Sequence, residues 1–181
     1  MLKWLLGTIL GVFLGILFYF ISYLGVFKPV DILEKQVGPL QLIYKNHVGP
    51  YHKIVAALNE VEKWAKDNHI SCERTFGEFL DNPNTVEEGR LRANVGCVIE
   101  AHPSDEPIPQ LPEGWTSRAV PIKKYVTVEY EGSPGIGPLR VYPKVTDYFD
   151  AKHATIAGPV IEIYKIISDK AMVTTYLFPL E

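Results

Sequence analysis

The chain has 181 residues, enough for one domain of ordinary size and a short additional segment. Without Lys3 and Lys28, residues 29–181 hold 16 basic against 21 acidic side chains, a formal charge of −5. This balance argues against a nucleic-acid-binding surface, because contacts to phosphates require a basic patch.

Residues 4–27 form an uncharged apolar stretch. At about 1.5 Å per residue, a helix of this length spans roughly 36 Å, enough to cross a hydrocarbon layer of about 30 Å. We therefore predict a transmembrane anchor over residues 1–28, in the bacterial inner membrane or, in a eukaryote, the ER membrane. A cleavable signal peptide is the alternative, but its apolar core is typically about 7–15 residues long, and bulky Tyr23 lies close to the plausible cleavage point at Gly25.

Three glycines of this anchor, Gly7, Gly11 and Gly15, repeat every fourth residue. Small residues at this spacing let two membrane helices approach closely, so the pattern is compatible with a dimer. The alternative is that glycine is simply common in membrane helices. The charged segment 29–38 is expected to be a stalk that leads to the domain at 39–181.

The domain shows one pattern twice: a strand, a turn with glycine or proline, a helix and two further strands. Repeat one covers 39–101 and repeat two covers 115–181, and a proline-rich linker at 102–114 joins them. In repeat one, apolar residues three or four apart predict a helix that starts near Pro50 and stops at Asn68. In repeat two, Pro143 interrupts the pattern, so the regular helix is expected to begin there.

The strand at 158–164 carries a single acid, Glu162, in an apolar run. Alternate residues of a strand share a face, so Glu162 and Tyr164 point the same way. The strand around Glu78 has a similar pattern, and a pseudo-twofold between the repeats would place Glu78 and Glu162 in related positions.

Several motifs carry a resemblance to a known family. They are the segment 44–51, the turn 81–83 followed by Arg92, and the pattern Gly158-Pro159-x-x-Glu162-x-Tyr164. In this order they resemble the GyrI-like small-molecule-binding domain of gyrase-inhibitor-type proteins and multidrug-sensing regulators. The resemblance implies an α+β fold in which two βαββ repeats form a curved antiparallel sheet with two helices.

The resemblance also implies a groove between the repeats, where a buried glutamate and aromatic rings bind lipophilic, cationic ligands. Glu162 matches that glutamate, with Glu78 as its repeat mate. Burial raises the pKa of such a carboxyl group, and a bound cation restores its charged form. Core packing is the alternative role for each aromatic residue. The candidate ligand-binding residues are Glu162, Tyr164, Glu78, Tyr44, Tyr51, Trp115, Tyr125, Tyr130 and Tyr142.

Two other functions stay open. The anchor and the segment 140–148 resemble the membrane-anchored, testis-expressed ER-phagy receptors, which suggests a protein-interaction adaptor. The autophagy motif of those receptors lies in a long acidic tail without a counterpart in this sequence, so an autophagy role is not carried over. Some GyrI-like proteins hydrolyse small electrophilic compounds with the groove glutamate, and Glu162 would then act as a general base.

Signatures of metal, cofactor or nucleophilic chemistry are weak, and we predict no cofactor, metal site or catalytic residue. The five histidines lack metal-binding spacing, and the glycine-rich segment 132–137 lacks the lysine of a phosphate-binding loop. Cys72 and Cys97 fall on strands that could be neighbours. They would form a disulfide in an oxidising compartment or stay as two buried thiols elsewhere.

Overall fold

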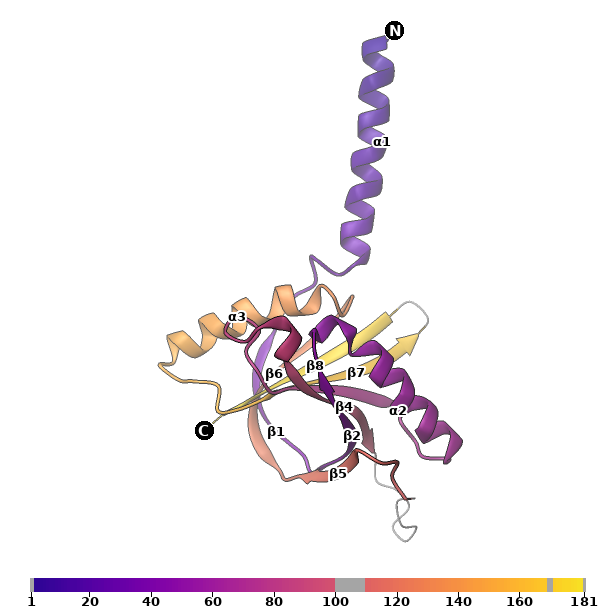
Figure 1. The fold of residues 1–181 in the computed structure, drawn as a ribbon. Helices are drawn as coiled ribbons and strands as arrows, with labels where there is room; N and C mark the ends of the chain where they lie inside the picture. The colour runs from indigo at the N-terminus through magenta and orange to yellow at the C-terminus, as the bar shows by residue number, and fades with distance from the viewer. Residues whose placement is uncertain (1, 100–109, 169–170, 181) are drawn as a thin grey trace.

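The computed structural model describes residues 2–99, 110–168 and 171–180. Within them, helix α1 (Leu2–Tyr23) projects from a domain in which helices α2 (Val55–Asp67) and α3 (Gly137–Ala151) cover one eight-stranded sheet (Figure 1). The strands are β1 (Ile32–Val37), β2 (Leu40–Val48), β3 (Arg74–Phe79), β4 (Arg92–Ile99), β5 (Trp115–Val120), β6 (Lys123–Glu131), β7 (Val160–Ser168) and β8 (Ala171–Pro179). Single 3-10 turns lie at Tyr51–Lys53 and Glu88–Arg90.

The sheet is antiparallel throughout, in the order β1-β6-β8-β7-β3-β4-β2-β5. Two units, β2-α2-β3-β4 and β6-α3-β7-β8, meet where β3 pairs with β7. The predicted α+β class, with a curved antiparallel sheet and two helices, is confirmed. Residues 102–109 of the predicted linker are not among the described residues.

The segment 29–38 is not a stalk, because β1 lies within it. This strand pairs with β6 of the second βαββ unit, and β5 pairs in the equivalent way with β2 of the first, so the strand before each unit forms an edge of the sheet beside the other unit. The side chain of Glu34 accepts hydrogen bonds from Tyr148 (2.7 Å) and Lys152 (2.5 Å) and forms an ion pair with Lys124 (2.5 Å). A charged edge strand, exposed over most of its length, lacks the apolar pattern that marks the inner strands.

The sheet has two distinct faces. The helix face is covered by α2, which buries Ala57, Val61 and Ala65, and by α3, which buries Val141, Val145 and Phe149. The inner face is enclosed by the curvature of the sheet, and its side chains form one apolar cluster drawn from both repeats. The members of that cluster that are buried are Leu40, Leu42, Phe76, Val98, Val120, Tyr125, Ile161, Ile163 and Leu177.

Two features of the helices follow from single residues. Helix α2 ends at the predicted residue, Asn68, whose side-chain amide donates a hydrogen bond to the carbonyl oxygen of Trp64 (2.9 Å). Helix α3 begins at Gly137, not at Pro143 as expected, and Pro143 lies inside it. Pro143 cannot donate to the carbonyl of Leu139, but Leu139 is 72% exposed, so water can bond to that carbonyl instead.

Cys72 and Cys97 form a disulfide, with their Cα atoms 5.5 Å apart. The bond connects the segment before β3 to β4, under the apolar cluster of α2. Of the two alternatives that the sequence left open, the structure therefore has the disulfide. Structural disulfides persist mainly in oxidising compartments.

Helix α1 is exposed along almost all of its length and is long and apolar enough to cross a membrane, although a signal sequence would have the same character. Two hydrogen bonds attach the segment after α1 to the domain. The hydroxyl of Tyr130 donates to the carbonyl oxygen of Gly25 (2.7 Å), and the backbone N–H of Ser133 donates to the carbonyl oxygen of Leu24 (3.1 Å). A Cβ atom added at Gly7, Gly11 or Gly15 would meet no described atom within 4 Å, so these glycines are open to a second helix and dimerisation stays a prediction.

Candidate functional site

Glu162 lies on the helix face, in the middle of the sheet where β3 and β7 join the two βαββ units. Strand β7 places it opposite Gly77 of β3 and Tyr176 of β8. Its side chain is buried, with only 4% of the residue exposed. Because Gly77 has no side chain, the rings and methyl groups above it belong to Phe79 and Ile54. Glu162 is therefore a carboxyl group in mostly apolar surroundings.

Two tyrosine hydroxyls donate hydrogen bonds to this carboxylate. Tyr142 of α3 donates to Oε1 (2.8 Å), and Tyr164, two residues further along β7, donates to Oε2 (2.9 Å). The ring of Tyr142 also makes edge contacts with the rings of Tyr176 and Phe178, at centroid distances of 6.1 and 5.4 Å. Among the residues that the structure describes, no Lys, Arg or His forms an ion pair with Glu162.

The electrostatics follow from this arrangement. Burial raises the pKa of Glu162 to about 7, against the two tyrosine hydrogen bonds, which lower it. Burial, and next the charge of Glu162, raise the pKa of Tyr142 and of Tyr164 well above the usual range, so both stay protonated donors. Near neutral pH the carboxyl group therefore sits between its charged and neutral forms, and a proton or a cation can compensate its charge.

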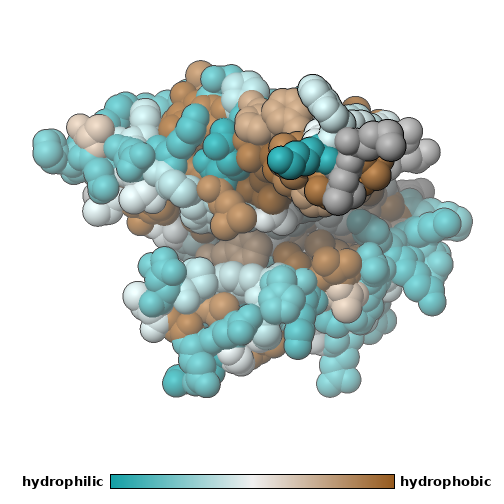
Figure 2. All heavy atoms as spheres, turned by 90° about the horizontal axis from the view of Figure 1, so that it is seen from above, coloured by the Kyte–Doolittle hydropathy of each residue, from teal (hydrophilic) through white to brown (hydrophobic). Residues whose placement is uncertain are grey.

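The start of α3 sets the position of Tyr142. A Cβ atom at Gly137, the first residue of α3, would overlap the hydroxyl oxygen of Tyr176, so only glycine allows the helix to approach β8 this closely. Figure 2 shows the molecule from above, with a hollow between two lobes and apolar residues along it. Glu162 lines neither of the two cavities with volumes of about 190 and 450 Å³. The hydroxyls of Tyr142 and Tyr164 occupy both oxygens of its carboxylate, so a ligand that contacts this group would compete with them.

Glu78 does not share the site with Glu162, contrary to the sequence-based expectation. In the sheet Glu78 pairs with Ile161, and Gly77 pairs with Glu162, so the two acids point to opposite faces. When β2 is superposed on β6 and the register is followed through β4 and β8, the position equivalent to Glu162 is Gly77. Glu78 lies on the inner face, where it accepts from Asn94 (2.7 Å) and Arg118 (2.8 Å).

Two predicted aromatic residues accompany Glu78 on the inner face. Tyr44 packs edge-on against Phe76, and the guanidinium group of Arg118 lies over the Tyr44 ring, 5.7 Å from its centre. Tyr125 is buried and lines a cavity beside Glu78. The prediction of one aromatic groove is therefore wrong for both residues, which belong to a different face from Glu162.

The other predicted aromatic residues have structural contacts. Trp115 packs on Trp64 of α2 (ring centroids 5.3 Å apart), and Tyr130 binds Gly25 as described above. The hydroxyl of Tyr51 donates to the carbonyl of Asp81 (2.8 Å) and accepts from its N–H (3.1 Å). Of the predicted set, Tyr142 and Tyr164 are the two that bond to Glu162 among the described residues. Tyr51 lies near the site, because its ring packs on Phe79 (centroids 4.6 Å apart) and, in addition to burial, its charge contributes to the raised pKa of Tyr142.

Sequence reasoning missed Tyr176, Gly77 and Gly137 beside Glu162, and Asn94 and Arg118 beside Glu78. The signal for Tyr176 was the alternation along β8, where Thr174, Tyr176 and Phe178 share one face. For the part of the chain that is described, no group of three or more His, Cys, Asp or Glu residues could hold a metal ion.

Comparisons with known proteins give the family. The family model of the GyrI-like small molecule binding domain matches residues 30–181. A DNA gyrase inhibitor of Pectobacterium carotovorum subsp. carotovorum (strain PC1) is 36% identical over 61 residues, which are 33% of this chain and 40% of that protein. The chain thus aligns with less than half the length of this relative.

Solved structures share the fold at low sequence identity. The C-terminal domain of EcmrR superposes with a TM-score of 0.62 at 13% identity, over 84% of this chain and 98% of that one. The matched chain of the EcmrR–DNA complex superposes with a TM-score of 0.64 at 12% identity, over 84% of this chain and 57% of that one. The structure of SAV2435 bound to tetraphenylphosphonium superposes with a TM-score of 0.54 at 10% identity, over 83% of this chain and 94% of that one. Since the family model covers residues 30–181, the chain belongs to the GyrI-like small-molecule-binding domain family.

Proposed function

We propose that the domain binds a lipophilic organic cation at Glu162 and that α1 holds it beside a membrane. The observation that carries the ligand proposal is a buried carboxylate with two tyrosine donors and no cationic partner among the described residues. A structural carboxylate in the same sheet, Glu78, has an arginine. The described residues provide no positive charge to compensate the carboxylate of Glu162, so in our proposal the ligand provides it.

The energetics favour a cation over a neutral ligand. A positive charge 4 Å from the carboxylate is worth about 4 kcal/mol at an effective dielectric constant near 20. The rings of Tyr142, Tyr176 and Phe178 pack on one another beside this acid, and a ring face within about 6 Å of a cation would add to the attraction. The ligand should be lipophilic, because Val160, Tyr176 and Phe178 belong to the buried cluster beside Glu162.

Access requires a side-chain rearrangement. Tyr142 stands on α3 and Tyr164 on β7, and both residues keep some solvent exposure although their hydroxyls are buried against Glu162. In our proposal these two side chains rotate outward to admit the ligand. A bound cation would then replace one or both hydroxyls beside the carboxylate.

Titration of the full chain in lipid nanodiscs with tetraphenylphosphonium tests the ligand proposal. We choose this probe because SAV2435, which shares the fold, has been solved bound to it. Glu162→Gln keeps the shape and removes the charge, and at pH 8 we expect it to weaken binding by at least about 10-fold. Triphenylphosphine oxide, a neutral compound of related shape, should bind both proteins alike. Equal affinity of the two proteins for the phosphonium would contradict the proposal.

The membrane proposal is independent of the ligand. Helix α1 is uncharged after Lys3, apolar over most of its length and exposed, and the contacts of Leu24 and Gly25 hold its end against the domain. The Cys72–Cys97 disulfide supports a position of the domain on the oxidising side of that membrane. Carbonate extraction of membranes checks the anchor: the protein should stay in the pellet, and a soluble product that lacks residues 1–23 would instead identify a cleaved signal.

A further inference from the structure

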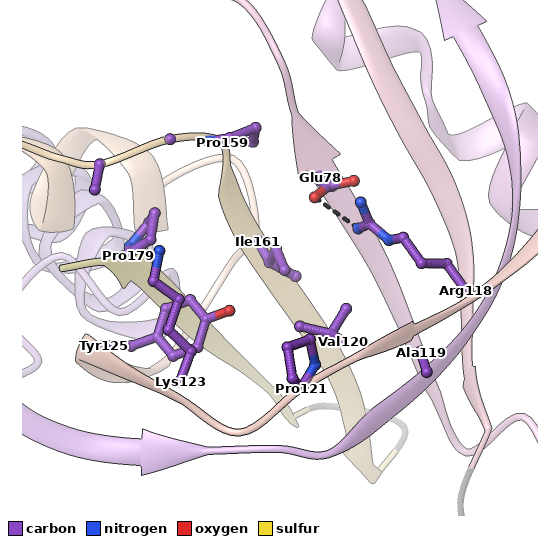
Figure 3. A pocket seen from close by; sticks show the side chains of 12 residues that line it. Glu78, Arg118, Ala119, Val120, Pro121, Lys123, Tyr125, Pro159, Ile161 and Pro179 are labelled. Carbon is purple, nitrogen blue, oxygen red and sulfur yellow. Dashed lines mark hydrogen bonds and ion pairs between the residues drawn. The ribbon is translucent and has the colours of Figure 1, made fainter. Parts of the chain in front are cut away.

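The smaller of the two cavities lies on the inner face, on the other side of the sheet from Glu162. Its volume is about 190 Å³. Figure 3 shows Ile161 at its centre, the pair Glu78 and Arg118 on one side, and Tyr125 with Lys123 on the other. A dry cavity of about 150 Å³ suffices for benzene, so this one accommodates a ligand of one ring with a small substituent.

The charges that line this cavity do not cancel. Glu78 accepts from Arg118 and from Asn94, so both of its oxygens are engaged. Lys123 also lines the cavity and has no ion-pair partner within the described ranges. With one acid and two bases, the lining carries one net positive charge, which is the opposite of what a cationic ligand requires.

The cavity also offers hydrogen-bond donors, which an anionic ligand needs for its acceptor oxygens. An arginine has five N–H donors, and Arg118 uses one nitrogen for Glu78, so further donors remain for a second acceptor. Lys123 contributes three donors, and the hydroxyl of Tyr125 points into the cavity (Figure 3). The remaining walls are apolar and come from Val120, Pro121, Pro159, Ile161 and Pro179.

We propose that this inner-face cavity binds a ring-sized organic monoanion, such as an aromatic carboxylate. Its carboxylate faces Lys123 on one side of the cavity, and its ring packs on Ile161 and the prolines. Arg118, on the other side, adds to the positive charge of the lining. The site shares no lining residue with Glu162, so one domain holds two sites of opposite charge preference on the two faces of one sheet.

Calorimetric titration of the full chain in nanodiscs with benzoate, and with benzyl alcohol as its neutral counterpart, tests the proposal. We expect benzoate to bind at least about 10-fold more tightly than the alcohol, since only the anion gains from the positive lining. Lys123→Gln, a change at an exposed side chain, should weaken benzoate binding by about 5-fold. Glu78→Gln should strengthen it, because the lining then loses its one negative charge.

The Glu162→Gln variant separates this site from the proposed cation site. It should lose phosphonium binding and keep its benzoate affinity. The proposal is overturned if benzoate does not bind, if benzyl alcohol binds equally well, or if Lys123→Gln and Glu78→Gln both leave the benzoate affinity unchanged. Melting curves of the variants without ligand establish that each is folded during the titration.

Discussion

Glu78 and Glu162 lie on neighbouring strands, one register position apart, and are almost equally buried, at 5% and 4% exposure. They differ in their partners. Glu78 has a guanidinium and an amide, whereas Glu162 has two neutral hydroxyls. If Glu162 receives a cation as we propose, burial alone does not distinguish a structural acid from a binding one. The distinction is whether the protein already provides the opposite charge.

The largest effect in this comparison is expected from Glu162→Gln, as a gain in stability at alkaline pH. The pKa of this group rises from 4.5 to about 7 on folding, so the folded state holds the proton more tightly than the unfolded state. The stability contributed by the protonated group is full below pH 4.5 and is lost as the pH rises to about 7, a loss of about 3 kcal/mol. The neutral amide avoids this loss.

Thermal unfolding at pH 8 and at pH 4.5 measures this effect. We expect the variant to melt at a higher temperature than the wild type at pH 8, and the difference to shrink at pH 4.5. A variant that is less stable than the wild type at pH 8 would show that the ionised carboxylate stabilises the fold.

A second change would make Glu78 resemble Glu162. Arg118→Met removes the cation and leaves a buried carboxylate with only Asn94. Breaking a fully buried pair costs about 3–5 kcal/mol, and since the Arg118 side chain is 41% exposed we expect about 2 kcal/mol. Urea unfolding at pH 8 measures this cost, and the double variant Glu78→Gln/Arg118→Met should recover most of it. Full stability of the single variant would mean that Arg118 is dispensable.

A smaller effect is expected from Tyr142→Phe. The lost hydrogen bond stabilises the charged form of Glu162, so its removal should raise the pKa of that group above about 7 and cost about 1 kcal/mol at pH 8. Carbon-13 NMR of the Glu162 carboxyl group follows the titration directly. Tyr125→Phe on the inner face is the matched control and should not move it; an unchanged midpoint in Tyr142→Phe would show that this hydroxyl does not support the charge.

The helix α2 and the strand of Glu162 could be predicted because each depends on a local pattern. Apolar spacing through Val61 and Ala65 indicated α2, and the alternation in β7 put Glu162 and Tyr164 on one face. The alternation of polar and apolar residues carries this information whatever the rest of the chain does.

The strand pairing between the two βαββ units could not be predicted in the same way. Strand β1 has a charged, exposed sequence and acquires its role only from β6, which lies about 90 residues away. Glu78 looked equivalent to Glu162 because both acids stand among apolar residues, but it is offset by one position, and an offset of one residue turns a side chain to the other face of a sheet. Only the register between strands shows this offset.

The pH dependence of tetraphenylphosphonium binding, measured by calorimetry in two buffers of different ionisation enthalpy, tests the role of Glu162 most directly. With a pKa of about 7, the wild type should bind about 10-fold more tightly at pH 8 than at pH 6, and at pH 6 it should release close to one proton per cation bound. Glu162→Gln should show neither effect. Binding by the wild type that is independent of pH and releases no proton would contradict the assignment of Glu162 as the group that receives the cation.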